Sequence, residues 1–93
     1  MYIEREDQEA SGYFKAVIDG RDAGKMSYSV VGDNQIIIDH TEVNSEYQGQ
    51  GVGKALVEKS AEYARNENLK ISPQCSYAKK IMERSSDFDD VLA

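Results

Sequence analysis

The sequence predicts a mixed α+β domain built around one sheet, because its two halves carry different periodicities. Up to residue 43, apolar and polar side chains alternate in short runs separated by glycine-containing turns, which is typical of an antiparallel β-meander. Residues 53–64 instead repeat apolar and small side chains at the spacing of one helical face. A short extended segment and a second helical segment follow, so we expect the first helix to cross over to a parallel strand.

Four strands are expected in the first half. A short, charged edge strand begins the chain, and the next strand places Phe14 and Ala16 on one face. Residues 20–24, which begin and end with glycine, are expected to form the hairpin connection to its antiparallel partner. The three consecutive isoleucines at 36–38 predict a central strand that is buried on both faces. The expected strands cover residues 2–6, 13–19, 25–30 and 35–43.

The second half is expected to form a helix, a short strand and a second helix. The first helix should end at residues 66–68, and its stripe of small residues should face the sheet. Residues 69–75 are extended, and Pro73 lacks the N–H that a ladder bond requires, so this parallel strand should lie at an edge. Ser76 is expected to cap a helix that runs to about Ser85. Because one block of the sheet is antiparallel and the other parallel, a cleft should open between the two parallel strands.

A glycine-rich loop precedes the first helix and lies at the mouth of this cleft. Gly49, Gly51 and Gly53 occupy alternate positions, which allows positive φ angles and turns several backbone N–H groups into one concavity. The helix that follows adds unpaired N–H donors and the positive end of its dipole. The loop is therefore expected to bind a phosphate or pyrophosphate, with Lys54 as an outer positive charge.

Two common phosphate-binding motifs do not fit this loop. A Walker A motif aligned on Gly53 and Lys54 has Gln48 in place of its first glycine and Ala55 in place of its hydroxyl residue. The dinucleotide fingerprint fits Gly49 and Gly51, but its third glycine falls on Lys54. Neither motif therefore identifies the phosphate-bearing ligand.

Length and composition restrict the other functions. The 93 residues are expected to form a single domain over residues 1–93. With 17 acidic and 11 basic residues, the net charge of −6 argues against nucleic acid or an anionic membrane as a partner. Cys75 is the single cysteine, and no group of Cys and His suggests a metal site. There is no long apolar stretch, and the polar N-terminus resembles neither a signal nor a transit peptide, so a cytoplasmic location is expected.

The loop sequence and its surroundings resemble the GNAT superfamily of N-acetyltransferases. Residues 48–53 read Gln-x-x-Gly-x-Gly, the pyrophosphate-loop pattern of that family, and the order of elements agrees over residues 13–86. The likeness is greatest to short single-domain GNAT-like proteins, which carry a His-Thr-x-Val strand end and a Pro-x-Cys-Ser stretch. Here these are residues 40–43 and 73–76.

This resemblance implies a minimal GNAT-like fold that uses acetyl-CoA as acyl donor and needs no metal. The backbone N–H of Val43 should hold the thioester carbonyl, because negative charge develops on that oxygen during acyl transfer; a bulge near this point would free the N–H. The acceptor should be a small-molecule or peptide amine, and the chain a monomer or a homodimer. The residues expected to bind coenzyme A are Val43, Gln48, Gly49, Gln50, Gly51, Val52, Gly53 and Lys54.

The catalytic candidates are less well determined by the pattern. His40 is expected to point into the cleft as general base, and Glu42, two residues further on the same face, is the rival base. Cys75 stands where the family commonly has Asn, and Met82 where it has the Tyr that protonates the thiolate. Cys75 is then general acid, acetyl-accepting nucleophile or an inert buried cysteine, and Tyr77 is a substitute acid.

Two further readings remain open at this point. Longer members of the family build their acceptor pocket from two helices between the first two strands and from a final hairpin, and this sequence has neither. A module that binds coenzyme A or acyl-CoA without robust turnover is the first alternative. A protein-interaction domain whose cleft docks a lysine or an N-terminus of another chain is the second.

Overall fold

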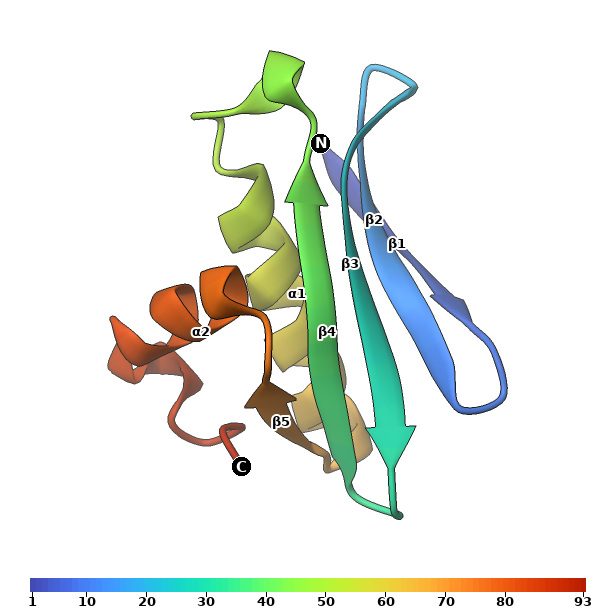
Figure 1. Ribbon diagram of the computed structural model, residues 1–93, viewed down its shortest axis with the longest axis vertical. Coiled ribbons are helices and arrows are strands. Elements are labelled where there is room, and N and C mark those ends of the chain that lie inside the picture. Colours follow the sequence, from blue (N-terminus) through green and yellow to red (C-terminus); the bar gives the residue numbers. More distant parts are fainter.

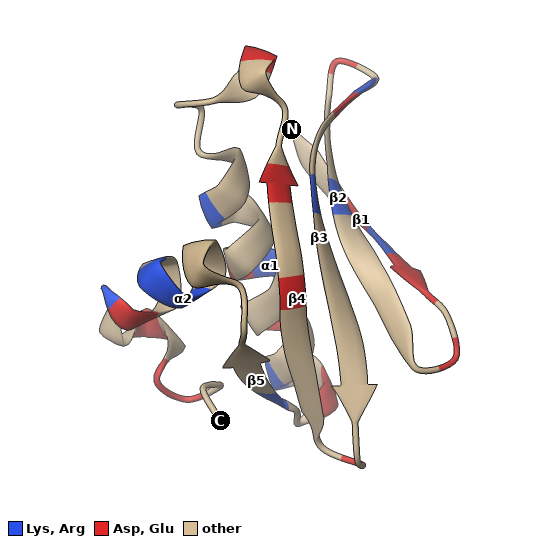
Figure 2. Ribbon diagram, in the orientation of Figure 1, with Lys and Arg blue, Asp and Glu red and all other residues tan.

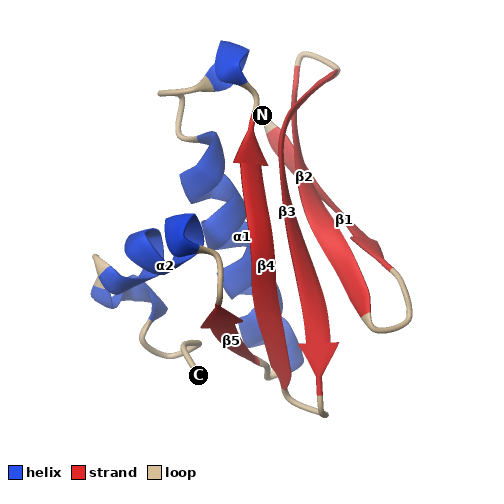
Figure 3. Ribbon diagram, viewed as in Figure 1, coloured by secondary structure: helices blue, strands red, loops and turns tan.

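The computed structural model describes residues 1–93 as one five-stranded sheet with its helices packed against a single face (Figure 1). The strand order is β1-β2-β3-β4-β5; the first four strands are antiparallel, and β5 runs parallel to β4. This confirms the predicted α+β class with one mixed sheet (Figure 3). The elements are β1 (Tyr2–Asp7), β2 (Ser11–Ile18), β3 (Arg21–Val31), β4 (Gln35–Val43), a 3₁₀ turn (Ser45–Tyr47), α1 (Val52–Glu67), β5 (Lys70–Pro73), α2 (Ser76–Glu83) and a second 3₁₀ turn (Ser86–Phe88).

The core lies between this face of the sheet and α1. Phe14, Met26 and Tyr28 from the sheet are fully buried beneath the helix. The predicted small-residue stripe of α1 is buried along its whole length, which allows the helix to lie close to the strands. We call the other side of the sheet, which no helix covers, the open face. The stripe residues are Gly53, Leu56, Val57, Ser60, Ala61 and Ala64.

The isoleucines of β4 are buried on one side only, so the expectation of a strand buried on both faces is wrong. Ile36 and Ile38 point into the core and are 0% exposed, whereas Ile37 is half-buried on the open face. A continuous apolar run predicts two buried faces only if both faces are covered. Here the covering elements lie on one side.

The hairpin between β2 and β3 is tighter than predicted. Its turn consists of Asp19 and Gly20, whose φ angles are +50° and +77°, and β3 already begins at Arg21. Two consecutive positive φ angles match the right-handed twist of the flanking strands better than a five-residue connection would. Ala23, which was expected in the turn, is the extra residue of a bulge in β3, where Ala16 pairs with Gly24 and Val17 with Asp22.

A second bulge interrupts β4. Tyr28 of β3 pairs with Ile38, but the preceding Ser27 pairs with His40, so Asp39 has no partner of its own. One extra residue reverses which side chains face which side of the sheet. Beyond the bulge, odd-numbered residues of β4 turn toward the helices and even-numbered residues turn toward the open face.

The C-terminal half agrees with prediction except at the start of its last helix. β5 pairs with β4 in parallel as expected, and α1 ends at Asn68, which adopts the left-handed conformation. The N-cap of α2 is Cys75, whereas Ser76, the predicted cap, is already helical.

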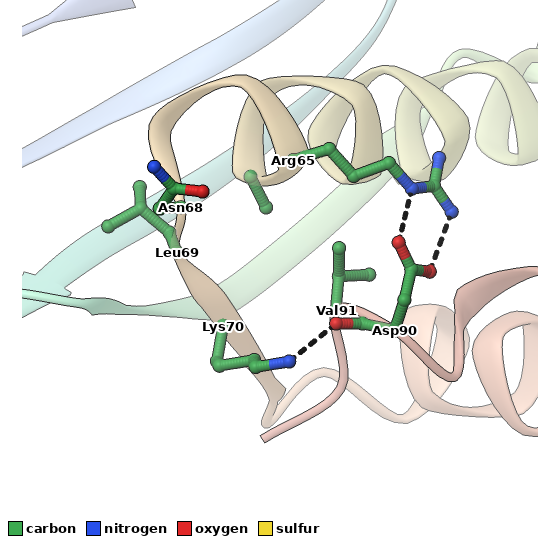
Figure 4. A pocket seen from close by; sticks show the side chains of 7 residues that line it. Arg65, Asn68, Leu69, Lys70, Asp90 and Val91 are labelled. Atoms are coloured by element: carbon green, nitrogen blue, oxygen red, sulfur yellow. Dashed lines mark hydrogen bonds and ion pairs between the residues drawn. The ribbon is translucent and has the colours of Figure 1, made fainter.

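Residues 86–93 pack back against the sheet and cover the outer edge of β5. Phe88 and Val91 are buried, and Leu92 forms a parallel bridge with Ile71. The guanidinium of Arg65 holds Asp90 through two hydrogen bonds of 2.7 and 3.0 Å, which Figure 4 shows together with the bond from Lys70 to the Asp90 carbonyl.

Candidate functional site

The two parallel strands separate halfway along β4. Their pairing ends where Ile38 meets Pro73, and the N–H groups of Gln74 and Cys75 both donate to the Ile38 carbonyl at 3.0 and 3.1 Å. After Pro73 the chain turns into α2, while β4 continues to Val43 paired with β3 on its other side only. The predicted cleft is therefore present, and β4 has a free edge inside it.

The glycine loop has the backbone geometry of an anion cradle. Gly49 and Gly51 have φ angles of +81° and +78°, and a Cβ atom on either would meet no other atom within 4 Å. Backbone conformation, and not space, thus requires glycine at these two positions. Gly51 is the N-cap of α1, so the N–H groups of its first turn have no partner within the helix.

Gly53 is needed for a different reason. It is helical and buried, and a Cβ atom there would collide with the ring and hydroxyl of Tyr77 from α2. The Tyr77 ring therefore lies directly against the first turn of α1, beside the free N–H donors. Gly49 and Gly51 are thus required by their backbone conformation, and Gly53 by the lack of space for a side chain.

The loop, the end of β4 and the start of α2 enclose one hollow of about 270 Å³, which we call the loop cavity. Tyr47 lines it although the sequence did not single it out as a binding residue; an aromatic residue next to the glycines was the available signal. The lining residues are Val43, Tyr47, Gln48, Gly49, Gly51, Val52, Gly53 and Tyr77.

Two of the expected coenzyme A residues do not line the loop cavity. The N–H of Gln50 donates to the Tyr47 carbonyl and closes the turn before α1, and its side chain is exposed. Lys54 borders another hollow of about 270 Å³ between α1 and α2, together with Arg84. Figure 2 shows positive side chains on the first turn of α1, where Lys54 lies, and on α2, which carries Lys79 and Lys80, although the chain as a whole is acidic.

The backbone at the end of β4 offers a donor to the cleft. The N–H of Asn44 donates to the Ala23 carbonyl of β3 at 2.9 Å. Because successive N–H groups of a strand point to opposite edges, the N–H of Val43 faces the edge that β5 has left. The bulge lies at Asp39, four residues before Val43.

Cys75 lies at the point where the strands separate. Its side chain is half-buried, and its Sγ is 3.5 Å from Oγ1 of Thr41 on β4. Burial alone would raise the pKa of the Cys75 thiol. Hydrogen bonds from the Thr41 hydroxyl and from the N–H groups of Ala78, Tyr77 and Thr41 outweigh burial, so the pKa lies below its ordinary value.

His40 and Glu42 do not point into the loop cavity, contrary to the prediction for His40. Nε2 of His40 lies 3.0 Å from Oε1 of Glu42, and both side chains are on the open face, 65% and 71% exposed. The bulge at Asp39 is the cause, because without it these residues would share the face of Ile38. Thr41 and Val43 take the inward positions instead.

Another hollow, of about 430 Å³, lies at the opposite end of α1 from the glycine loop (Figure 4). Its charged side chains, Arg65, Lys70 and Asp90, are already bound to one another or to the tail backbone. We interpret it as part of the attachment of residues 86–93.

Neither helix combines the length and apolarity that crossing a bilayer would require. No three side chains of Cys, His, Asp and Glu come together in a way that could hold a metal ion.

Comparisons with known proteins point to one family. Residues 13–91 match the family described as GCN5-related N-acetyl-transferase. The solution structure of a GCN5-like protein from Staphylococcus aureus is similar, with a TM-score of 0.72 and 38% identity over 97% of this chain and 87% of that chain. A Bacillus anthracis structure solved with acetyl coenzyme A has a TM-score of 0.62 and 20% identity, covering 72% of this chain and 39% of that chain.

Protein NATD1 from Gallus gallus is a more distant relative. It is 30% identical over 64 residues, which make up 69% of this chain and 58% of that protein. The match therefore spans little more than half the length of this curated relative.

Proposed function

The chain belongs to the GCN5-related N-acetyltransferase family, and from this premise we propose that it moves the acetyl group of acetyl-CoA to an amine by direct transfer at the free edge of β4. The observation that carries the proposal is the loop cavity, which joins a positive-φ glycine loop and a helix N-terminus to the edge of β4. The related Bacillus anthracis structure, which contains acetyl coenzyme A, supports the same donor.

On the donor side, the loop residues would hold the pyrophosphate through backbone N–H groups. The positive φ angles of Gly49 and Gly51 and the unpaired first turn of α1 support this assignment. Lys54 would act at longer range, since it borders the neighbouring hollow. The N–H of Val43 would stabilise the oxyanion; such a donor is worth about 3 kcal/mol.

On the acceptor side, we assign the general base to His40, with Glu42 holding the imidazole. Their 3.0 Å contact and their exposure on the open face support an approach of the amine from that side. His40 takes one proton from the ammonium and passes it to solvent, the amine nitrogen forms a bond to the thioester carbon, and the carbon–sulfur bond then breaks as the nitrogen loses its second proton. The leaving thiolate takes one proton and departs as coenzyme A.

We assign the donation of a proton to the leaving thiolate to Cys75, with Tyr77 as the second candidate; the second proton lost by the amine nitrogen then restores the acid. Cys75 is half-buried where the strands separate and is hydrogen-bonded to Thr41. The Tyr77 hydroxyl lies over Gly53, close to the phosphate end of the cavity, which supports a role in donor binding more than in proton transfer.

Calorimetry with acetyl-CoA and with coenzyme A tests the shared premise. Saturable binding at micromolar to millimolar ligand is expected, and Gly51→Ala should weaken it. Absence of binding at about millimolar ligand would reject both acetyl transfer and coenzyme A binding and would leave the protein-interaction domain as the remaining candidate.

Thiol release with a panel of amines then tests turnover. His40→Gln should lower kcat about 100-fold or more while leaving acetyl-CoA affinity unchanged, since a general base contributes about 10² to 10⁴ in rate. Cys75→Ala should lower kcat, and a variant that keeps the full rate would remove Cys75 from the reaction. Tyr77→Phe should mainly change acetyl-CoA affinity.

A coenzyme A binding module without turnover is the second candidate. The observation that favours it is the open face, where no helix covers His40 and Glu42. Binding of acetyl-CoA without thiol release in the presence of any amine would support it.

A further inference from the structure

A polar groove crosses the open face, on the opposite side of β4 from the loop cavity. Two hollows of about 220 and 160 Å³ lie side by side there, because both are bordered by Lys25 of β3 and Glu42 of β4. Each is smaller than a typical drug-binding pocket, so the groove suits a small guest. We call it the open-face groove; its other charged and polar side chains are Lys15, Asp22, Ser27, His40 and Asn44.

Two opposite charges in this groove, those of Lys25 and Glu42, face each other but are not paired with each other. Lys25 and Glu42 stand directly opposite each other in the β3–β4 register, a position where opposite charges normally form a cross-strand pair. The Glu42 carboxylate instead contacts His40 at 3.0 Å, and the Lys25 ammonium lies 4.2 Å from the centre of the Tyr13 ring. The two charges therefore face the same groove without neutralising each other.

Lys25 is also the cation of the groove that remains available. The other one, Lys15, has two carboxylate partners, Glu4 and Asp22, each at 3.6 Å. Lys25 has no carboxylate within ion-pair distance. An anionic group of a ligand would therefore bind to Lys25, and an ammonium group of the ligand would bind to Glu42 and His40.

Resting on the proposed function, we infer that the acceptor is a free amino acid, held with its amine at His40 and Glu42 and its carboxylate at Lys25. The guest needs both charges separated by only a few bonds, because the two protein charges lie on directly opposed residues of neighbouring strands. Its amine would then sit behind Thr41 and Val43, the residues of β4 that turn toward the donor side. Polyamines have no carboxylate, and the side-chain amines of lysine-rich peptides have none within a few bonds, so both would leave Lys25 unused.

Acceptor pairs that differ only in the carboxylate provide the sharpest test. Initial rates would be measured with free L-amino acids and with their carboxamides, for the natural protein and for Lys25→Gln. Lys25→Gln should lower kcat/KM for the acids about tenfold, the value expected for one charged hydrogen bond, and should change kcat/KM for the amides less than about twofold. Comparing ratios between variants cancels the different basicities of the two kinds of amine.

Two controls accompany this measurement. Lys25→Arg should keep the preference for acids, because it keeps the charge. Lys59→Gln removes a lysine of α1 that pairs with Glu62. It should change kcat/KM neither for the acids nor for the amides. Calorimetry should give the same acetyl-CoA affinity for all variants.

Several outcomes would overturn the inference. They are an equal loss for acids and amides in Lys25→Gln, a natural protein that acetylates amides or polyamines as well as the acids, or no turnover with any amino acid. If acetyl-CoA binds and other amines are acetylated, the inference fails while the proposed function stands. If acetyl-CoA does not bind, the proposed function itself fails.

Discussion

Gly51 shows how a single residue determines the shape of the loop. Its φ of +78° lies in the left-handed region, and the space around it is empty, so only backbone strain opposes a side chain. We predict that Gly51→Ala lowers the free energy of unfolding by about 1–2 kcal/mol, the usual cost of this conformation for an L-residue. Urea unfolding measures this loss.

Gly51→Asn is the matched variant, because asparagine tolerates left-handed backbone better than alanine does. It should cost less stability than Gly51→Ala. Equal losses in the two variants would show that the added side chain, and not the φ angle, causes the damage.

Thr41 is the residue through which β4 acts on Cys75. Burial raises the pKa of the Cys75 thiol, and the hydrogen bonds from Thr41 and from α2 lower it further than burial raises it. We predict that Thr41→Val raises the thiol pKa, so that the rate of alkylation by iodoacetamide reaches half its maximum at a higher pH. Thr41→Ser keeps the hydroxyl and should behave like the natural protein. An unchanged midpoint in Thr41→Val would contradict this role.

At the residue scale, the backbone geometry of the loop could be predicted from the sequence, and the face on which His40 and Glu42 lie could not. The spacing of glycines depends on the backbone conformation of the loop itself. Gly49, Gly51 and Gly53 could therefore be recognised as loop residues without knowledge of the segments that pack around them. The side on which His40 lies depends on the bulge at Asp39, and the contact between Lys25 and the groove depends on the β3–β4 register. Both are properties of strand pairing, which no single segment encodes.

Among the elements, residues 86–93 are attached to α1 by a surface ion pair between Asp90 and Arg65. The Arg65 guanidinium holds the pKa of Asp90 below its usual value. A carboxyl whose folded pKa is lowered contributes its full stability above its unfolded pKa, near 4, and loses it as the pH falls through the folded pKa.

We therefore predict that Asp90→Asn destabilises the protein at neutral pH and that the difference from the natural protein shrinks below about pH 4. Urea unfolding at a series of pH values measures this difference. A constant gap from pH 7 to pH 3 would mean that the carboxylate charge is not responsible. Asp89→Asn, which changes a neighbouring exposed carboxylate, should have little effect at any pH.

Elements with a strong internal period were predicted well, and their connections less so. The stripe of α1 and the alternation of β2 are repeated several times, so one irregular residue does not hide them. The Asp19–Gly20 turn was missed although Asp-Gly is a strong hairpin signal, because the glycines at 20 and 24 suggested a longer loop. The start of α2 was placed one residue late, since Ser76 is the better capping side chain but Cys75 occupies that position.

For the whole molecule, residues 86–93 complete a small core. A chain of 93 residues has a total stability of only about 5–14 kcal/mol. Phe88 is 5% exposed and belongs to the main core cluster, so Phe88→Ala should cost about 3–5 kcal/mol and remove a large part of that total.

A fall in the urea midpoint with an unchanged slope would confirm this loss. Asp89→Ala, next to it and exposed, should change the free energy of unfolding by about 0.5 kcal/mol or less. If Phe88→Ala is equally mild, the tail is not part of the cooperative unit.

The bulge at Asp39 has a consequence for how this strand tolerates insertions and deletions. Loss of Asp39 alone would leave Ile38 opposite Tyr28 and His40 opposite Ser27, so every other side chain would keep its face. Loss of Thr41 would instead shift the residues that follow by one position and exchange the faces of Glu42 and Val43. In the nine residues of β4, Asp39 is therefore the position at which a one-codon deletion leaves the other side chains of the strand on the faces that they occupy now.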